Sequence, residues 1–169
     1  MKLNYPVVII TGILTILLVF TLFGMLKAEN IIPDSVSKTI VELPDNLYLG
    51  LIAEDTGGNY ETYLVIASVV RNRLERGMWH GLVALKRKDL NEFVNKNYHY
   101  VKITRGKDLI QLAKKAINEV NSGKDYAANA THYEHTQVFS VPYWVAEDNM
   151  KVVKVLHAGT EKEITCYKK

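Results

Sequence analysis

In the middle of the chain, apolar positions recur at the spacing of α-helices. A first helix is predicted over residues 46–55, where Leu47, Leu51 and Glu54 fall at i, i+4 and i+7 and therefore share one face. Asp45 precedes this helix as a candidate cap. Burying a glutamate costs free energy, so a carboxylate on the inward face needs either a charged partner or a chemical role.

The same spacing of apolar residues predicts two further helices. One is predicted over residues 59–76, with Asn59 as its cap and Gly77 as its stop, and another over residues 107–121, before Gly123. Their inward stripes contain Tyr63, Leu64, Ala67, Val70 and Leu74 in the former and Ile110, Ala113, Ile117 and Val120 in the latter.

The pattern changes after Lys124, where aromatic and β-branched residues alternate with polar ones. Residues 152–156 and 164–167 are predicted to be short strands joined by a turn. The fold class that follows is α+β, mostly helical, with a small β element late in the chain.

The start of the chain has a different composition, because residues 7–26 contain no charged side chain. A span of about 20 apolar residues has the length that crosses a bilayer core. A cleaved signal peptide is the alternative, since Lys2 supplies a basic start, but Leu26 stands where a cleavage site requires a small residue. We therefore favour an uncleaved signal anchor.

This anchor defines the predicted organisation of the chain. Residues 1–6 are expected in the cytoplasm, residues 7–26 in the membrane, residues 27–44 as a tether, and residues 45–169 as one exported domain. The protein would be a single-pass protein of the cytoplasmic membrane, with its N-terminus inside and its domain in the periplasm or cell-wall space.

Charge and cysteine content limit the partners and the metal sites that the chain is expected to have. The net charge of +3 is mild, so it suits an anionic polymer such as a bacterial wall and does not require nucleic acid as a partner. Cys166 is the only cysteine among 169 residues, so the chain forms no internal disulfide and no thiolate metal site of its own. No cofactor is expected, and the sequence does not indicate an oligomeric state.

Glu54 is the first candidate for chemistry. A glycosidic bond breaks when an acid protonates its oxygen, and burial against apolar walls raises a carboxyl pKa enough to keep that proton. The structural alternative is an ion pair between Glu54 and Arg71 or Arg73 of the next helix. Asp55 is expected to point elsewhere on the helix, into solvent.

Residues 130–145, "ATHYEHTQVFSVPYWV", form the second candidate cluster. The aromatic rings of Tyr133, Tyr143 and Trp144 are suited either to stacking on sugar faces or to completing a small core.

A zinc site is a further hypothesis for the same segment, with His132, Glu134 and His135 as ligands. Their spacing matches no metalloprotease motif, so no metal is expected here.

Two segments resemble the spore-cortex-lytic and related cell-wall hydrolase family of bacteria and their phages. Residues 53–73 align without a gap on the family's core motif, A-E-A-R-G-E-P-Y-E-G-Q-V-A-V-A-A-V-V-L-N-R, and residues 123–133 align on its motif G-x-D-P-T-G-N-A-L-Y-Y. The identical positions in the first segment are Ala53, Glu54, Gly57, Tyr60, Glu61, Ala67, Val69, Val70, Asn72 and Arg73. Trp144 falls near the family's late tryptophan, and the resemblance covers residues 47–168.

The resemblance implies a lysozyme-like domain that cleaves the glycan strands of peptidoglycan, typically by lytic transglycosylation. It implies that Glu54 is the catalytic acid, that Glu61 supports the site or touches sugar, and that Tyr133 and Trp144 line the groove. It also implies that the Asn129 side chain fixes the loop beneath the groove by hydrogen bonds to the backbone.

Several positions depart from the family's pattern. Gly58 replaces a glutamate, Asn59 replaces a proline, and Glu134 and His135 replace Phe-Asn. These departures raise the alternative of a non-catalytic, membrane-tethered module that binds peptidoglycan through the same groove. The leading hypothesis is a membrane-anchored peptidoglycan lytic enzyme in cell-wall remodelling or phage lysis.

Overall fold

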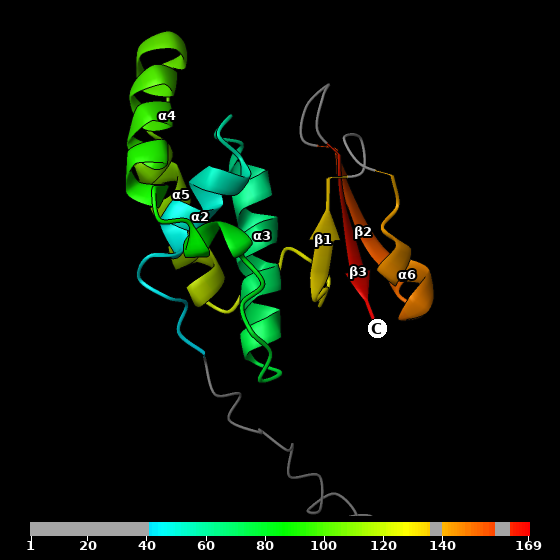
Figure 1. The fold of residues 1–169 in the computed structure, drawn as a ribbon. Coiled ribbons are helices and arrows are strands. Elements are labelled where there is room, and N and C mark those ends of the chain that lie inside the picture. The colour runs from blue at the N-terminus through cyan, green and yellow to red at the C-terminus, as the bar shows by residue number, and fades with distance from the viewer. Residues whose placement is uncertain (1–40, 136–139, 158–162) are drawn as a thin grey trace, which may run out of the picture. The chain divides into compact units, whose positions relative to one another are not determined.

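A computed structural model describes residues 41–135, 140–157 and 163–169, which belong to a compact unit that spans Thr39–Lys169 (Figure 1). Helices come first along the chain, and the strands come late. This arrangement confirms the predicted mostly helical α+β class. The elements in order are α2 (Leu47–Glu54), α3 (Tyr60–Leu74), η1 (Val83–Lys86), α4 (Leu90–Arg105), α5 (Leu109–Asn121), β1 (His132–Glu134), α6 (Tyr143–Glu147), β2 (Lys151–His157) and β3 (Glu163–Lys168).

Helix α3 is the centre of the helical part. It packs against α5 and α2 through a continuous core that includes Tyr63, Ile66 and Val70, all fully buried. The predicted cap is confirmed, because the Asn59 side chain accepts hydrogen bonds from the N–H groups of Glu61 and Thr62 at 2.9 and 3.2 Å. Helix α3 is thus fixed at its start and buried along its length.

The late strands form an antiparallel sheet in the order β1-β3-β2. Both predicted strands are confirmed as β2 and β3, and β1 joins them through the pair Tyr133 and Cys166. Ile164 and Cys166 face the helical part and pack with Val65 and Val69 of α3. The opposite face carries α6 (Figure 1). The Trp144 ring of this helix meets the Tyr167 ring edge-on, with centroids 5.4 Å apart.

Helix α4 was not predicted from the sequence. Only Leu90, Val94 and Val101 are buried along its 16 residues, so the apolar stripe is too sparse to identify it. It ends at Gly106, which adopts the left-handed conformation at φ 63°.

Two predictions about the start of the helical part are wrong. Asn46, not Asp45, occupies the cap position of α2, and its side chain makes no capping hydrogen bond. Asp55 is fully buried rather than solvated. The chain leaves the helix at Asp55, so the helical spacing used for the prediction no longer applies there.

Asp55 instead organises the turn between α2 and α3. Its carboxylate accepts hydrogen bonds from the N–H groups of Gly57 and Asn59 at 2.9 and 3.2 Å, and its carbonyl accepts one from the Tyr63 hydroxyl at 2.9 Å. Gly58 adopts φ 66° in this turn, and a Cβ there would lie 2.4 Å from the Leu109 side chain. The turn therefore requires both the buried aspartate and the glycine.

None of the helices in the described residues combines the length and the apolar character needed to cross a membrane. The predicted membrane span over residues 7–26 lies outside the part of the chain that the structure describes.

We expect Asp55→Asn to destabilise the fold by about 2 kcal/mol, because an amide would replace an acceptor of two backbone N–H groups in a buried position. The free energy of unfolding from urea titration measures this loss. Asp45→Asn is the matched control, since Asp45 is exposed. Equal stability of the two variants would contradict the role given to Asp55.

Candidate functional site

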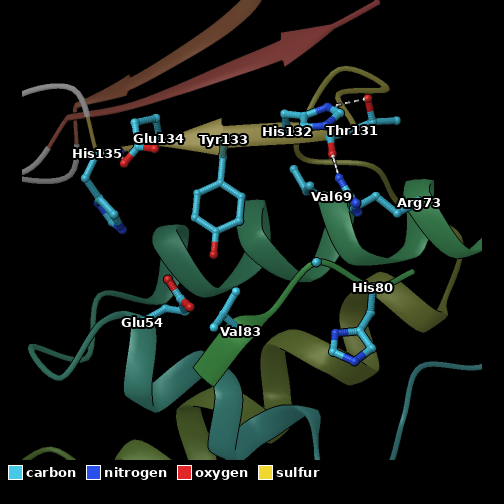
Figure 2. Close-up of a pocket in the computed structure, with 11 residues that line it drawn as sticks. Glu54, Val69, Arg73, His80, Val83, Thr131, His132, Tyr133, Glu134 and His135 are labelled. Atoms are coloured by element: carbon cyan, nitrogen blue, oxygen red, sulfur yellow. Dashed lines mark hydrogen bonds between the residues drawn. The ribbon is translucent and has the colours of Figure 1, made fainter. Parts of the chain in front are cut away.

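A cleft of about 300 Å³ opens between the helical part and the sheet (Figure 2). Helix α3 forms its floor, Glu54 and the segment around η1 form one wall, and β1 with its flanking residues forms the other. The residues that line it are Glu54, Val69, Arg73, His80, Gly81, Val83, Thr131, His132, Tyr133, Glu134 and His135.

Glu54 lies at the last position of α2, half-buried, and its carboxylate faces the cleft. Burial raises its pKa above the ordinary value for glutamate, because the charged form loses solvation. Hydrogen bonding from the Tyr133 hydroxyl and the charge of His135 oppose this rise, whereas the charge of Glu134 adds to it. The net effect favours a carboxyl group that keeps its proton to a higher pH than a solvated glutamate.

Tyr133 comes from the middle of β1 and reaches across the cleft towards Glu54 (Figure 2). Its pairing with Cys166 turns the ring to the inner face of the sheet. Burial, and the nearby Glu54 carboxylate, raise the pKa of Tyr133 well above its ordinary value. The hydroxyl therefore stays protonated and faces Glu54, where it stabilises the charged form of the carboxyl group.

Arg73 holds the two walls of the cleft together from its floor. Its Nε donates to the Trp79 carbonyl at 2.7 Å, and its Nη1 donates to the Thr131 carbonyl at 2.8 Å. Gly81 lies directly against the guanidinium, since a Cβ there would be 2.9 Å from Nε. The width of the cleft thus depends on Arg73.

The alternative role for Glu54, an ion pair with an arginine of α3, is not seen among the described residues. Arg71 instead pairs with Glu75 at 3.5 Å and donates to the Val120 carbonyl at 2.5 Å. Arg73 donates to two carbonyl groups. In the described part of the chain, Glu54 therefore faces the cleft without either arginine as an ion-pair partner.

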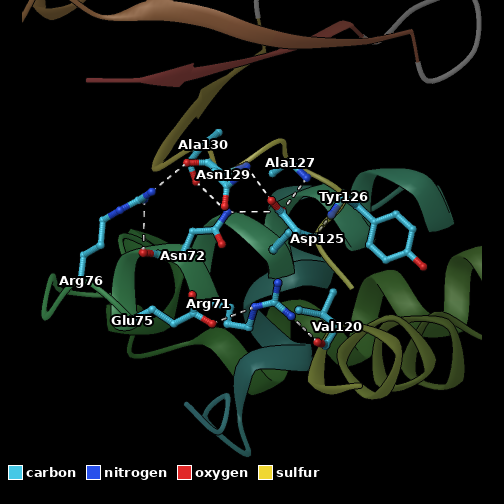
Figure 3. A network of polar contacts seen from close by, with 11 residues as sticks. Arg71, Asn72, Glu75, Arg76, Val120, Asp125, Tyr126, Ala127, Asn129 and Ala130 are labelled. Atoms are coloured by element: carbon cyan, nitrogen blue, oxygen red, sulfur yellow. Dashed lines mark hydrogen bonds and ion pairs between the residues drawn. The ribbon is translucent and has the colours of Figure 1, made fainter. Parts of the chain in front are cut away.

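A polar network fastens the turn that leads into β1 (Figure 3). The Asn72 amide donates to the Asp125 carboxylate at 3.3 Å and to the Ala130 carbonyl at 3.0 Å. The same carboxylate accepts from the N–H groups of Ala127 and Asn129 at 2.9 and 2.5 Å. Asn72 and Arg73 are adjacent on α3, so this helix end positions both the turn and the strand that carries Tyr133.

The cleft brings together only some of the predicted site residues. Tyr133 lies opposite Glu54, whereas Glu61 is exposed in the first turn of α3, outside the cleft lining. Tyr143 is 76% exposed and lines a separate hollow beside α6. Trp144 reaches the cleft indirectly, because its ring contacts the His132 ring at 5.3 Å between centroids.

Asn129 acts differently from the prediction. It adopts φ 60°, its N–H donates to Asp125, and its carbonyl accepts from Arg76 at 3.2 Å. Its observed contacts with the loop are therefore made by its backbone, and the side chain that organises the loop is Asp125.

The sequence did not identify His80 and Val83 as site residues. Both lie between predicted helices, in a segment where apolar residues have no regular spacing. His132, Glu134 and His135 all line the cleft, but in the described part of the chain no three histidine, cysteine, aspartate or glutamate side chains converge closely enough to hold a metal ion.

No protein-family model, curated protein or solved structure matches the chain.

We expect Gly81→Ala to destabilise the protein more than Gly77→Ala does, by about 1–3 kcal/mol. Both glycines have positive φ, 89° and 68°, but only at position 81 would the new methyl group meet the Arg73 guanidinium; at position 77 it would meet nothing within 4 Å. The difference in unfolding free energy isolates the contact from backbone strain. Equal losses would show that Arg73 and the loop are not tightly packed in solution.

Proposed function

We propose that the chain is a membrane-anchored enzyme that cleaves the glycan strands of peptidoglycan, with Glu54 as its general acid and base. The observation that carries this proposal is the half-buried carboxyl of Glu54, which has a raised pKa and faces a cleft opposite the Tyr133 hydroxyl.

The proposed reaction uses one carboxyl group. Glu54 donates its proton to the glycosidic oxygen as the bond to the anomeric carbon breaks. The resulting carboxylate then accepts the proton of the muramoyl 6-hydroxyl as that oxygen bonds to the anomeric carbon, or the proton of an attacking water. The first route is lytic transglycosylation and the second is muramidase-type hydrolysis, and Glu54 regains its proton in both.

The cleft is too small to hold more than a part of a polymeric substrate. A volume of about 300 Å³ is at the lower end for a ligand pocket, so we expect the cleft to hold one portion of a longer glycan. His132 lines the cleft, and its ring lies at a tilt to the Trp144 ring with centroids 5.3 Å apart, so we expect this pair to meet a neighbouring sugar at the border of the cleft.

The two segments that resemble the cell-wall hydrolase family meet in space, which supports the resemblance. Asn72 of the first segment binds Asp125 and Ala130 of the second, and Arg73 binds Thr131. A chance similarity in two separate stretches would not require polar side chains of the first stretch to bind the second.

The departures from the family's pattern fall in two places. Gly58 and Asn59 serve the turn before α3 and lie outside the cleft lining, so they leave the proposed acid untouched. Glu134 and His135 line the cleft beside Glu54, where their charges act on its pKa in opposite directions. We infer that these two residues adjust the proton affinity of Glu54.

The lysozyme-like character of the fold and the location of the protein are part of the same proposal. A carboxyl group at a helix end that faces a small antiparallel sheet across a cleft supports the former. The uncharged span over residues 7–26 supports an anchor in the cytoplasmic membrane, with the enzyme on the cell-wall side.

We expect Glu54→Gln to reduce the release of soluble fragments from purified peptidoglycan by at least about a hundredfold, because glutamine keeps the size of the side chain but cannot donate the proton. Fragment release by the full chain is the measurement, and Glu92→Gln on the exposed side of α4 is the control. Equal activity of Glu54→Gln and the parent would refute the acid role. Binding without cleavage by either would favour the non-catalytic module.

We expect Tyr133→Phe to move the alkaline limb of the pH–rate profile to higher pH. The Tyr133 hydroxyl lowers the pKa of Glu54 by stabilising its carboxylate, so its removal raises that pKa, and the acid then keeps its proton to a higher pH. The profile of kcat/KM on soluble glycan fragments measures the shift. A shift to lower pH would contradict the proposed contact.

A further inference from the structure

The cleft has two chemically different ends (Figure 2). Glu54, Tyr133 and His135 gather at one end, and Arg73 and His80 lie at the other. The two ends differ in charge. At the first end lie two carboxyl groups, Glu54 and Glu134, and the charge of Glu134 adds to the rise that burial causes in the pKa of Glu54. At the second end, burial lowers the pKa of both His80 and His132, and the positive charge of Arg73 lowers it further.

Arg73 is a partly buried cation with neutral partners. Its guanidinium donates to the carbonyl groups of Trp79 and Thr131, and among the described residues no carboxylate forms an ion pair with it. Burial lowers its pKa, which reflects the loss of solvation around the guanidinium. A buried charge is normally compensated by an opposite charge, so this end of the cleft is suited to an anion.

Two neighbours add a hydrogen-bond donor and a positive charge to this end. The Leu82 N–H donates to Nδ1 of His80 at 3.1 Å, so the proton of the neutral ring is on Nε2, which remains as a donor. Lys86 lies over the Trp79 ring with its Nζ 4.1 Å from the centroid, and its charge, like that of Arg73, acts on His80.

We propose that this basic end is a subsite for a carboxylate carried by the glycan, with Arg73 at its centre and His80 and Lys86 at its rim. The proposal rests on the proposed function, and it specifies the substrate: a sugar unit bearing an acidic substituent is bound beside the unit whose linkage meets Glu54. A neutral polymer of the same sugar backbone would leave the Arg73 charge uncompensated. The subsite therefore selects glycans that carry carboxylates over neutral ones.

Binding to the full-length Glu54→Gln variant tests this selection without cleavage. The probes are a peptide-free strand of alternating N-acetylglucosamine and N-acetylmuramic acid with free lactyl carboxylates, and the same strand with those carboxylates converted to methylamides. We expect the free carboxylates to tighten binding about tenfold, the effect of one charge-assisted hydrogen bond. Raising the salt concentration from about 0.05 to about 0.5 M should reduce the difference.

The location of the subsite is tested by adding His80→Phe and Lys86→Gln together to the Glu54→Gln chain. Arg73 is kept in these variants, because it holds both walls of the cleft. We expect the preference for the carboxylate strand to fall to about threefold or less. The matched control is His99→Phe with Lys96→Gln, which changes an exposed histidine and an exposed lysine on α4.

Each outcome has a distinct meaning. A carboxylate preference that falls in the cleft variant and not in the control supports the subsite. Equal binding of both strands, with cleavage by the parent chain intact, overturns the subsite and leaves the proposed function standing. A preference that is the same in the cleft variant and the control overturns the assigned location. Binding of neither strand overturns the subsite together with the function on which it rests.

Discussion

The arrangement of the cleft depends on how one end of α3 binds backbone carbonyl groups. Arg73 reaches Trp79 on one wall and Thr131 on the other, while its neighbour Asn72 reaches Ala130. A guanidinium group presents several donors in a rigid plane, so one side chain can serve carbonyl groups from two segments far apart in sequence. Without these bonds, the helical part and the sheet would share mainly the apolar contacts between α3 and β3.

This fixed geometry explains why Glu54 has unusual proton affinity. Its position at the end of α2 leaves it half-buried, and the sheet supplies Tyr133, Glu134 and His135 around it. The pKa of Glu54 is therefore a property of the assembled walls and not of α2 alone. The same walls leave Arg73 as a cation bound to neutral groups, so acid chemistry and anion binding would occupy opposite ends of one cleft.

The sequence identified those elements whose burial is one-sided and periodic. The helices now seen as α2, α3 and α5 and the strands β2 and β3 were predicted, because each carries an apolar pattern of its own. Helix α4 was missed because its buried positions are few, and β1 was missed because a strand of three residues is too short to show alternation. Asp55 was misjudged because its environment is a turn that only the packed chain creates.

By itself, the sequence determined the mostly helical class and the place of Glu54 on an inward face, because both follow from local periodicity. It did not determine how the cleft around Glu54 is assembled. Tyr133 comes from a strand that is distant along the chain from Arg73 and His80, and only tertiary packing brings the three to one cleft. Desolvation, which sets the proton affinity of Glu54, likewise arises only when those distant segments exclude water from the same space.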